Sequence, residues 1–208
     1  NGINIKEYNK THFNKEDIRN ELNIANEKII IGQIGRITLG KGHYELIKAA
    51  EIINKNHSDN VIFLIVGSSS KNEQHIEIEI KKLAAECKVK NILFPGYRSD
   101  IARILAGIDI LAFPSHEESF GITLLEAMAM EVPVVATGNA GITDIIPNNE
   151  YGLLVPPKNF NALAERLLEL IDNPDLRKNL AANGRKRIVE NFDIEKLTLE
   201  LIKQYEES

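Results

Sequence analysis

Residues 108–130, IDILAFPSHEESFGITLLEAMAM, contain three kinds of segment in succession. Residues 108–113 form an apolar run rich in branched side chains, residues 114–121 form a polar loop that ends in glycine, and residues 122–130 have the spacing of a helix. A buried strand that passes through a short loop into a helix is the repeating unit of a parallel α/β sheet. This stretch therefore indicates the fold class.

The same alternation extends along the chain from about residue 28. Further apolar runs predict strands at residues 28–32, 61–66, 91–94, 132–136 and 151–155, and helical patterns lie near 42–56, 73–87, 99–106, 141–147, 160–172, 175–190 and 194–206. Strands that are apolar on both faces and alternate with helices predict a parallel sheet covered on both sides. Because crossovers are right-handed, the predicted fold class is α/β, a Rossmann-like, doubly wound parallel sheet of six strands.

The chain divides into three parts by composition. Residues 1–27 are polar and rich in Asn and Lys, and predict a linker or peripheral arm outside the core. Residues 28–192 predict the Rossmann-like domain, and residues 193–208 contain a last helix. The sequence opens at Asn1 without a methionine, which suggests a fragment that begins at an internal boundary.

Charge and cysteine content exclude some classes of protein. The net charge is -5, and no basic cluster typical of a nucleic-acid binder is present, so no nucleic-acid partner is expected. The short group Arg185-Lys186-Arg187 is interpreted as a solvated helix surface. Cys87 is the single cysteine, which favours a reducing, cytoplasmic location. No apolar run approaches the ~20 residues that span a bilayer.

Small, polar or glycine-rich loops follow the first five predicted strands. In an open α/β sheet, ligands bind outside the carboxyl ends of the strands, which all lie at one edge. The loops begin at residues 32, 67, 95, 114 and 137. One crevice at this edge is therefore expected to use residues from all of them.

The loop after the first strand combines glycines with two cations. Gly35 and Arg36 leave the strand, and Lys41 enters the next helix. Arg36 can clamp two phosphate oxygens, Lys41 adds a mobile charge, and the helix N-terminus attracts an anion, so the loop suggests a diphosphate clamp. A tight turn with two solvated charges is the alternative. The loop lacks both the dinucleotide-binding glycine spacing and the P-loop ending, which argues against a dehydrogenase and a nucleotide triphosphatase.

The loop after the fourth strand carries two carboxylates around a glycine turn. Glu118 precedes the helix and Glu126 lies inside it, in an otherwise apolar stretch, where a carboxylate is costly unless paired. The backbone amides of Phe120, Gly121 and Ile122 can face an anion. The alternative is that Glu118 caps the helix and Glu126 is exposed.

The segment Glu118-Ser-Phe-Gly-Ile-Thr-Leu-Leu-Glu126 resembles the Glu-x7-Glu motif of retaining nucleotide-sugar glycosyltransferases of group 1 (glycosyltransferase family 4). These enzymes have a GT-B fold, and this chain is similar to its second half. The similarity covers nearly the whole chain, and the other matching segments are Asn1-Gly-Ile-Asn, Gly35-Arg36 with Lys41-Gly42, Phe94-Pro-Gly96, Phe113-Pro-Ser115, Pro133-Val-Val-Ala-Thr137 and Gly152-Leu-Leu-Val-Pro156. The chain departs from the family where Gly67-Ser-Ser-Ser70, Met130-Glu131-Val132, Ala140-Gly141 and Asp144 stand in place of the usual residues.

The resemblance implies a role for each candidate residue. Arg36 and Lys41 would hold the donor diphosphate, Glu126 would accept hydrogen bonds from the ribose, and Glu118 would be the catalytic-site carboxylate at the donor sugar. The remaining substrate-binding candidates are Gly35, Ser115, the amides of Phe120, Gly121 and Ile122, and Tyr97 or Arg98 beside the base. The resemblance implies no metal ion, because the cations and the helix dipole would stabilise the departing nucleotide diphosphate. It implies no cofactor, since the nucleotide-diphosphate sugar is the donor substrate.

The resemblance also implies a function shared with a missing half. With an N-terminal acceptor domain, such a chain would transfer a sugar to a glycan or lipid-linked acceptor with retention of configuration, in cell-surface polysaccharide synthesis. That domain would supply any peripheral contact with the cytoplasmic membrane face, and the helix within residues 193–208 would pack toward it. The isolated chain would be inactive. A non-catalytic nucleotide-sugar-binding module and a nucleotide-sugar epimerase are the alternatives.

Overall fold

The computed structural model describes residues 2–207, so the ends of the predicted arm and of the last segment, Asn1 and Ser208, lie outside the described residues. Within that range, six parallel strands form one sheet in the order β3-β2-β1-β4-β5-β6. The strands are β1 (Ile29–Ile34), β2 (Val61–Val66), β3 (Ile92–Gly96), β4 (Ile110–Phe113), β5 (Val134–Thr137) and β6 (Leu153–Val155). The predicted α/β, Rossmann-like fold is confirmed, and the strand order reverses between β1 and β4.

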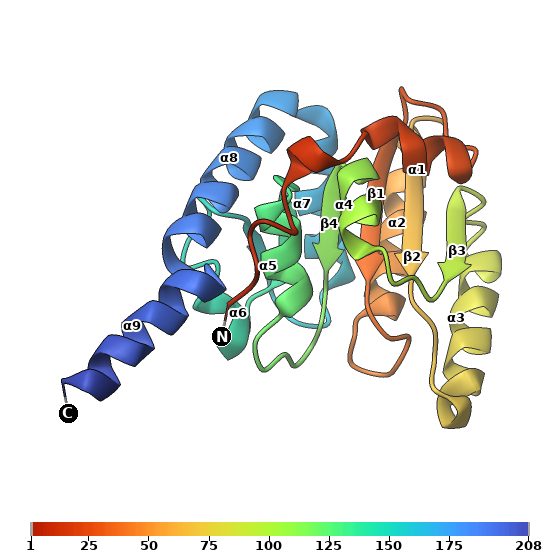
Figure 1. Ribbon diagram of the computed structural model, residues 1–208. Coiled ribbons are helices and arrows are strands. Elements are labelled where there is room, and N and C mark those ends of the chain that lie inside the picture. The colour runs from red at the N-terminus through yellow and green to blue at the C-terminus, as the bar shows by residue number, and fades with distance from the viewer. Residues whose placement is uncertain (1, 208) are drawn as a thin grey trace.

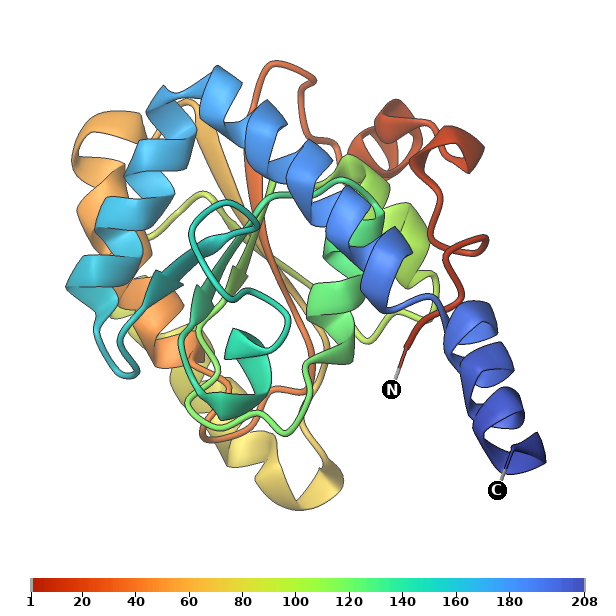
Figure 2. The ribbon, with the colours of Figure 1, turned by 90° about the vertical axis from the view of Figure 1, so that its left-hand side faces the viewer.

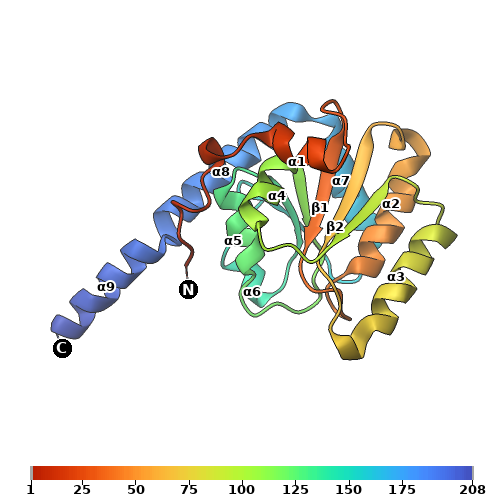
Figure 3. The same cartoon turned by 45° about the vertical axis from the view of Figure 1, so that its right-hand side comes forward.

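Helices cover both faces of the sheet (Figures 1 and 3). α2 (His43–His57), α3 (Gln74–Glu86) and α7 (Phe160–Asp172) cover one face, while α1 (Lys15–Glu21), α4 (Ile101–Gly107) and α5 (Ile122–Ala129) cover the other. α8 (Pro174–Asn191) contacts both α5 and α7, and so joins the two layers at one end of the sheet (Figure 2). The other short elements are η1 (Lys10–His12), η2 (Lys71–Glu73) and α6 (Ala140–Thr143).

The central strand β1 is longer than the sequence predicts. The predicted run ends at Gly32, whereas β1 continues through Gln33 to Ile34 and pairs with β2 over its whole length. A Cβ atom at Gly32 would lie 2.3 Å from Cδ1 of Ile108. Glycine therefore stands inside the strand because the Ile108 side chain occupies the space beside it.

The N-terminal segment is part of the core, so its prediction as a linker or peripheral arm was wrong. Ile3, Ile18 and Ile24 are buried and belong to the apolar cluster on the α4 and α5 face. Ile18 packs so closely on α4 that a Cβ atom at Gly107 would lie 2.1 Å from its Cγ2. A few isoleucines in a polar stretch are enough to bury this segment, because α1 is short and presents one apolar side chain to α4.

A buried guanidinium fixes α1 to the sheet. Arg19 is fully buried, and it donates hydrogen bonds to the carbonyl oxygens of Gly107, Asn26 and Lys28. Its Nη2 atom lies 2.5 Å from Oδ2 of Asp109. The same Oδ2 atom accepts the N–H of Ile30 at 2.8 Å. Because the buried charge is paired and its donors are bonded, it links α1, β1 and the start of β4.

Two arginines of the basic group on α8 are structural, so its interpretation as a solvated surface was wrong for them. Arg185 donates to the carbonyl oxygens of Tyr8 and Ala129. Arg187 donates to the carbonyl oxygens of Ile145 and Asp144 and lies over the rings of Tyr151 and Phe192. These bonds satisfy backbone acceptors at the ends of other elements.

The last helix, α9 (Ile194–Glu206), extends away from the rest of the chain (Figures 1 and 2). It contains no buried residue among those described, and Leu199, Leu201 and Ile202 are 61%, 52% and 46% exposed. Packing of this helix on another domain stays a prediction. Within residues 2–207, no helix combines the length and apolar character needed to cross a membrane.

The buried position of Ile18 predicts its contribution to stability. Ile18→Ala is expected to lower the free energy of unfolding by about 2–5 kcal/mol, because the cavity left against α4 cannot close fully. Urea unfolding followed by circular dichroism measures this change. Ile78→Ala on α3 is the matched control, since Ile78 is 66% exposed, and its effect is expected to stay within about 0.5 kcal/mol. Equal effects of the two substitutions would contradict the assignment of α1 to the core.

Candidate functional site

The loops after β1 and β4 meet at the point where the strand order reverses. Gly42, the N-cap of α2, has a φ of 75°, and a Cβ atom there would lie 2.1 Å from the carbonyl oxygen of Pro114. The N–H of His116 donates to the carbonyl oxygen of Gly40 at 2.7 Å. Only glycine permits this approach at residue 42, and the two loops thereby form adjoining walls of one crevice.

One part of the crevice is a cavity of about 270 Å³ between these loops. Lys41 and Glu118 both line this cavity and form an ion pair, with Nζ of Lys41 2.6 Å from Oε2 of Glu118. Both side chains are mostly buried, so water screens this ion pair less than a surface pair. The predicted site residues that line the cavity are Gly35, Arg36, Lys41, Ser115, Glu118, Phe120, Gly121 and Ile122.

The second part is a larger cavity of about 550 Å³ that extends toward β2 and β3. The predicted site residues that line it are Gly35, Arg36, Tyr97, Arg98, Ile122 and Glu126. Ile34, Gly35, Arg36, Ile122 and Thr123 line both cavities, so the two parts adjoin at the N-terminus of α5. Every residue predicted from the sequence to belong to the site therefore lines one of the two cavities or both.

Arg36 stands where the two cavities meet. Within residues 2–207, its guanidinium makes no hydrogen bond and no ion pair. The charge of Arg36 also acts on Glu73. The hydroxyls of Thr38 and Ser70 donate hydrogen bonds to the Glu73 carboxylate and, together with the charge of Arg36, lower the pKa of Glu73. The donors of Arg36 are thus available for an anion in the crevice.

The N-terminus of α5 opens toward the same place. Gly121 caps the helix with a φ of 77°, and no side chain caps the first turn. The first backbone N–H groups of a helix have no partner inside it, and its dipole adds partial positive charge at that end. This helix end and Arg36 place positive charge at the centre of the crevice, and Lys41, paired with Glu118, adjoins them in the smaller cavity.

Glu126 lies one turn inside α5 and receives a hydrogen bond from the N-terminal segment. The hydroxyl of Tyr8 donates to Oε1 of Glu126 at 2.5 Å. Burial raises the pKa of Glu126, while the bond from Tyr8 acts in the opposite direction. Burial and the Glu126 carboxylate also raise the pKa of Tyr8, so the phenol stays protonated as the donor.

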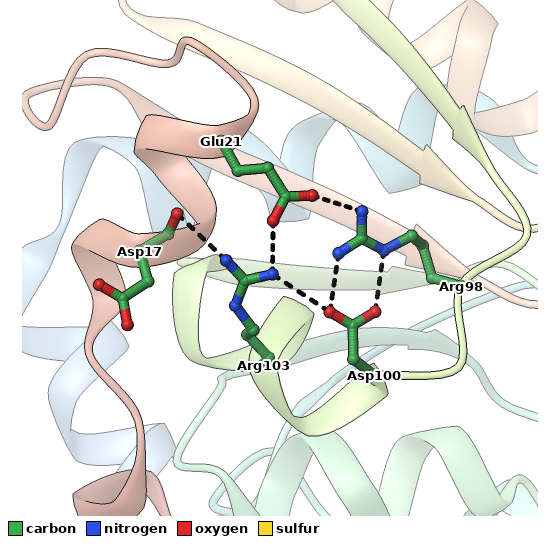
Figure 4. A network of polar contacts seen from close by, with 5 residues as sticks. All are labelled: Asp17, Glu21, Arg98, Asp100 and Arg103. Atoms are coloured by element: carbon green, nitrogen blue, oxygen red, sulfur yellow. Dashed lines mark hydrogen bonds and ion pairs between the residues drawn. The ribbon is translucent and has the colours of Figure 1, made fainter.

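Arg98 and Tyr97 both stand at the outer end of the larger cavity, but their side chains differ in what they contact. The guanidinium of Arg98 donates to both carboxylate oxygens of Asp100, at 2.8 and 2.7 Å, and to Glu21 of α1 (Figure 4). Arg103 joins the same network through Glu21 and Asp100. Arg98 is therefore held by protein carboxylates, whereas the ring of Tyr97 is 75% exposed at the cavity edge.

Other predicted residues have mixed roles. The hydroxyl of Ser115 is directed at the backbone, since Oγ lies 3.2 Å from the carbonyl oxygen of Glu117. The ring of Phe120 packs at a tilt on that of Phe192, while Ile122 is 58% exposed. His116 lies in the loop after β4. Its Nε2 atom lies 3.0 Å from Oε1 of the buried Glu45, which indicates a structural role.

Two buried polar residues of the smaller cavity were not predicted. Gln33 donates from Nε2 to the carbonyl oxygen of Lys41 at 2.7 Å, and its Oε1 atom has no partner within residues 2–207. Neither ring nitrogen of His43 has a partner in that range. Burial, aided by the charge of Lys41, lowers the pKa of His43 to about 4, so its ring is neutral at pH 7. Gln33 did leave a signal in the sequence, because it is a polar residue inside the apolar run that forms β1.

Within residues 2–207, no three His, Cys, Asp or Glu side chains are grouped so that they could hold a metal ion. The crevice instead combines two cations, Arg36 and Lys41, and a helix N-terminus, which suit an anionic ligand, with the carboxylates of Glu118 and Glu126 on either side.

Together, these observations define a Rossmann-like domain with a crevice at the carboxyl edge of the sheet, which is where such folds bind ligands. The family model described as "Glycosyl transferases group 1" matches residues 14–187. The chain therefore belongs to the group 1 glycosyltransferase family, as its resemblance implied.

Individual relatives agree with the family. The capsular polysaccharide biosynthesis glycosyltransferase CapM of Staphylococcus aureus is 32% identical over 206 residues, which cover 99% of this chain and 52% of CapM. The C-terminal domain of the group 1 glycosyltransferase LpcC from Francisella tularensis has a TM-score of 0.84 and 28% identity, over 93% of this chain and 100% of that structure. The chain spans about half the length of the curated relatives it matches.

A structure of HepE from Anabaena in complex with UDP is similar in fold, with a TM-score of 0.91 and 24% identity. The match covers 100% of this chain and 56% of HepE. The expectation that this chain has the fold of the second half of a GT-B enzyme is confirmed.

The raised pKa of Glu126 predicts a cost to stability. Between the ordinary carboxyl pKa of 4.5 and the raised folded-state pKa, the folded chain holds more protons than the unfolded chain. Stability due to this group therefore falls as pH rises through that window, and the loss persists at neutral pH. Glu126→Gln is expected to raise the free energy of unfolding at neutral pH and to have less effect near about pH 4.

Urea unfolding at the two pH values measures this difference. Glu165→Gln on α7 is the matched control, because Glu165 is exposed and the charge change is the same. A Glu126→Gln variant that is less stable than the parent at neutral pH would contradict the prediction.

Proposed function

We propose that this chain binds a nucleotide-diphosphate sugar along the crevice between β1 and β4. Joined to an acceptor-binding domain, it transfers the sugar to a glycan or lipid-linked acceptor with retention of configuration. The observation that carries the proposal is the position of Arg36. It stands between the Lys41–Glu118 pair in one cavity and Glu126 in the other.

The diphosphate is assigned to the centre of the crevice. Arg36, Lys41 and the first amides of α5 converge there, so that a flexible cation, a planar guanidinium and a helix dipole act on one anion. During transfer, negative charge develops on the departing nucleoside diphosphate. Preorganised donors that face this charge lower the barrier more than they strengthen ground-state binding.

The two glutamates are assigned to the two ends of the donor. Glu118 is assigned to the sugar hydroxyls near the reacting carbon, and its ion pair with Lys41 holds its carboxylate toward the cavity. Glu126 is assigned to the ribose in the larger cavity. The separate cavities support separate roles, because one ligand that spans both would place its sugar and its nucleoside on opposite sides of Arg36.

The base is assigned to the outer end of the larger cavity. Tyr97 offers an exposed ring on which a base can stack, whereas the guanidinium of Arg98 is already bonded to Glu21 and Asp100. Of the two residues that the resemblance placed beside the base, the structure thus favours Tyr97. Arg98 has a supporting role, because its network fixes the loop after β3.

Polysaccharide synthesis is the proposed setting. The similarity to CapM, a capsular polysaccharide glycosyltransferase, supports it. A cytoplasmic location is part of the proposal and agrees with the free thiol of Cys87. Contact with a membrane face is assigned to the acceptor domain.

Titration of the 208-residue chain with UDP, ADP, GDP and their sugar conjugates tests donor binding. Arg36→Ala and Lys41→Ala are each expected to weaken binding about ten- to hundredfold, because each removes a bond from a cation to the diphosphate. Isothermal titration calorimetry measures the dissociation constants.

Arg166→Ala and Lys55→Ala are the matched controls. Arg166 pairs with Glu169 on the surface of α7, and Lys55 is exposed on α2 away from the crevice. Neither control is expected to change the dissociation constant. A chain that binds none of these nucleotides, or whose binding is indifferent to Arg36→Ala and Lys41→Ala, would sink the proposal.

Transfer is expected to need the acceptor domain. Incubated with the best-binding nucleotide sugar and a glycan acceptor, the 208-residue chain is expected to form no product above the protein-free control. The larger polypeptide that includes an acceptor domain is expected to form product. Product formation by the isolated chain would contradict the division of labour, and interconversion of the sugar without any acceptor would favour an epimerase.

A further inference from the structure

The N-terminal segment, residues 2–13, places a phenol against Glu126, which lines the larger cavity. Tyr8 lies 118 residues before Glu126 in sequence, yet its hydroxyl donates to Oε1 of that carboxylate at 2.5 Å. Figure 1 shows this segment, in red, passing over α5 before it reaches α1. The bond connects a segment predicted to be peripheral with a residue that lines the larger cavity.

The backbone of Tyr8 is bonded to the same structural unit. Arg185 on α8 donates from Nη1 to the carbonyl oxygen of Tyr8 at 2.7 Å, and the same atom donates to the carbonyl oxygen of Ala129, the last residue of α5. The N–H of Tyr8 donates to the carbonyl oxygen of Asn4. One guanidinium therefore ties Tyr8 to the helix that carries Glu126, and the phenol and the carboxylate keep their relative position.

The bond from Tyr8 leaves one carboxylate oxygen of Glu126 for a ligand. Within residues 2–207, Oε2 of Glu126 makes no hydrogen bond, and Glu126 lines the larger cavity. A carboxylate has acceptor sites on both oxygens, so an anchored Oε1 does not prevent Oε2 from accepting a further bond. Anchoring removes rotamer freedom in advance, and a ligand then binds without the cost of ordering that side chain.

We infer that Tyr8 is a positioning residue that holds Glu126 by Oε1 so that Oε2 accepts a hydrogen bond from a ribose hydroxyl of the bound nucleotide. The inference rests on the proposed function, in which Glu126 binds the ribose. Tyr8 acts through Glu126, so its contribution depends on the presence of that hydroxyl in the ligand.

The test compares Tyr8→Phe with Tyr151→Phe in the 208-residue chain. Each change removes one hydroxyl and keeps the ring. The ring of Tyr151 lies under Arg187, outside both cavities, and its hydroxyl makes no hydrogen bond within residues 2–207. Calorimetry gives dissociation constants for UDP, ADP and GDP, and then for the 2′,3′-dideoxy form of the nucleotide that binds best.

Tyr8→Phe is expected to raise the dissociation constant of the ribonucleotide about three- to tenfold. The dissociation constant of the dideoxy nucleotide is expected to stay the same, and Tyr151→Phe is expected to change neither. In a Glu126→Ala background, Tyr8→Phe is expected to have no further effect, because the residue through which it acts is gone.

Four outcomes would overturn the inference. If Tyr8→Phe weakened the binding of the ribonucleotide and of the dideoxy nucleotide equally, Tyr8 would only support the fold. Additive effects of Tyr8→Phe and Glu126→Ala on the dissociation constant would show the same. Tighter nucleotide binding by the Tyr8→Phe variant would show that the phenol competes with the ribose for Glu126. Absence of nucleotide binding by the parent chain would overturn the proposed function and this inference with it, whereas the first three results leave donor binding intact.

Discussion

The pairing of β1 with β4 is the constraint on which the rest of the structure depends. The two strands run parallel at the centre of the sheet, and the helices that follow them, α2 and α5, cover opposite faces, which opens a crevice above the carboxyl ends of the pair. Asp109 ties the start of β4 to β1 and to Arg19, while the contact of Gly42 with Pro114 ties the loops at the other end. The crevice exists because both ends of this pair are fixed.

Charge in the crevice is arranged at some cost to stability. Within residues 2–207, Arg36 has no ion-pair partner and no side chain caps the N-terminus of α5, while Lys41 is paired with Glu118 and Glu126 is buried with a raised pKa. His43, deep in the same cavity, is neutral at pH 7 and so adds no further repulsion. Such concentrations of unfavourable electrostatics are retained where a ligand supplies the missing partner.

Local patterns in the sequence were enough to predict the strands, most helices and the site loops. Apolar runs and glycine turns are short-range signals, and the carboxyl-edge rule then places Arg36, Lys41 and Glu118 together without coordinates. Long-range contacts left no such signal. Nothing near Tyr8 in sequence indicates its bond with Glu126, and a polar stretch hides the burial of Ile18, because burial is decided by the element that packs against it.

The burial of Arg19 decides where this unit can be cut from a longer polypeptide. A piece that began at residue 28 would keep every strand of the sheet, yet Asp109 would lose its buried guanidinium and α4 would lose the isoleucine packed on Gly107. An unpaired acidic group beside the central strand is costly. Domain exchange between related enzymes should therefore carry residues 3–27 along with the sheet, although they precede its first strand.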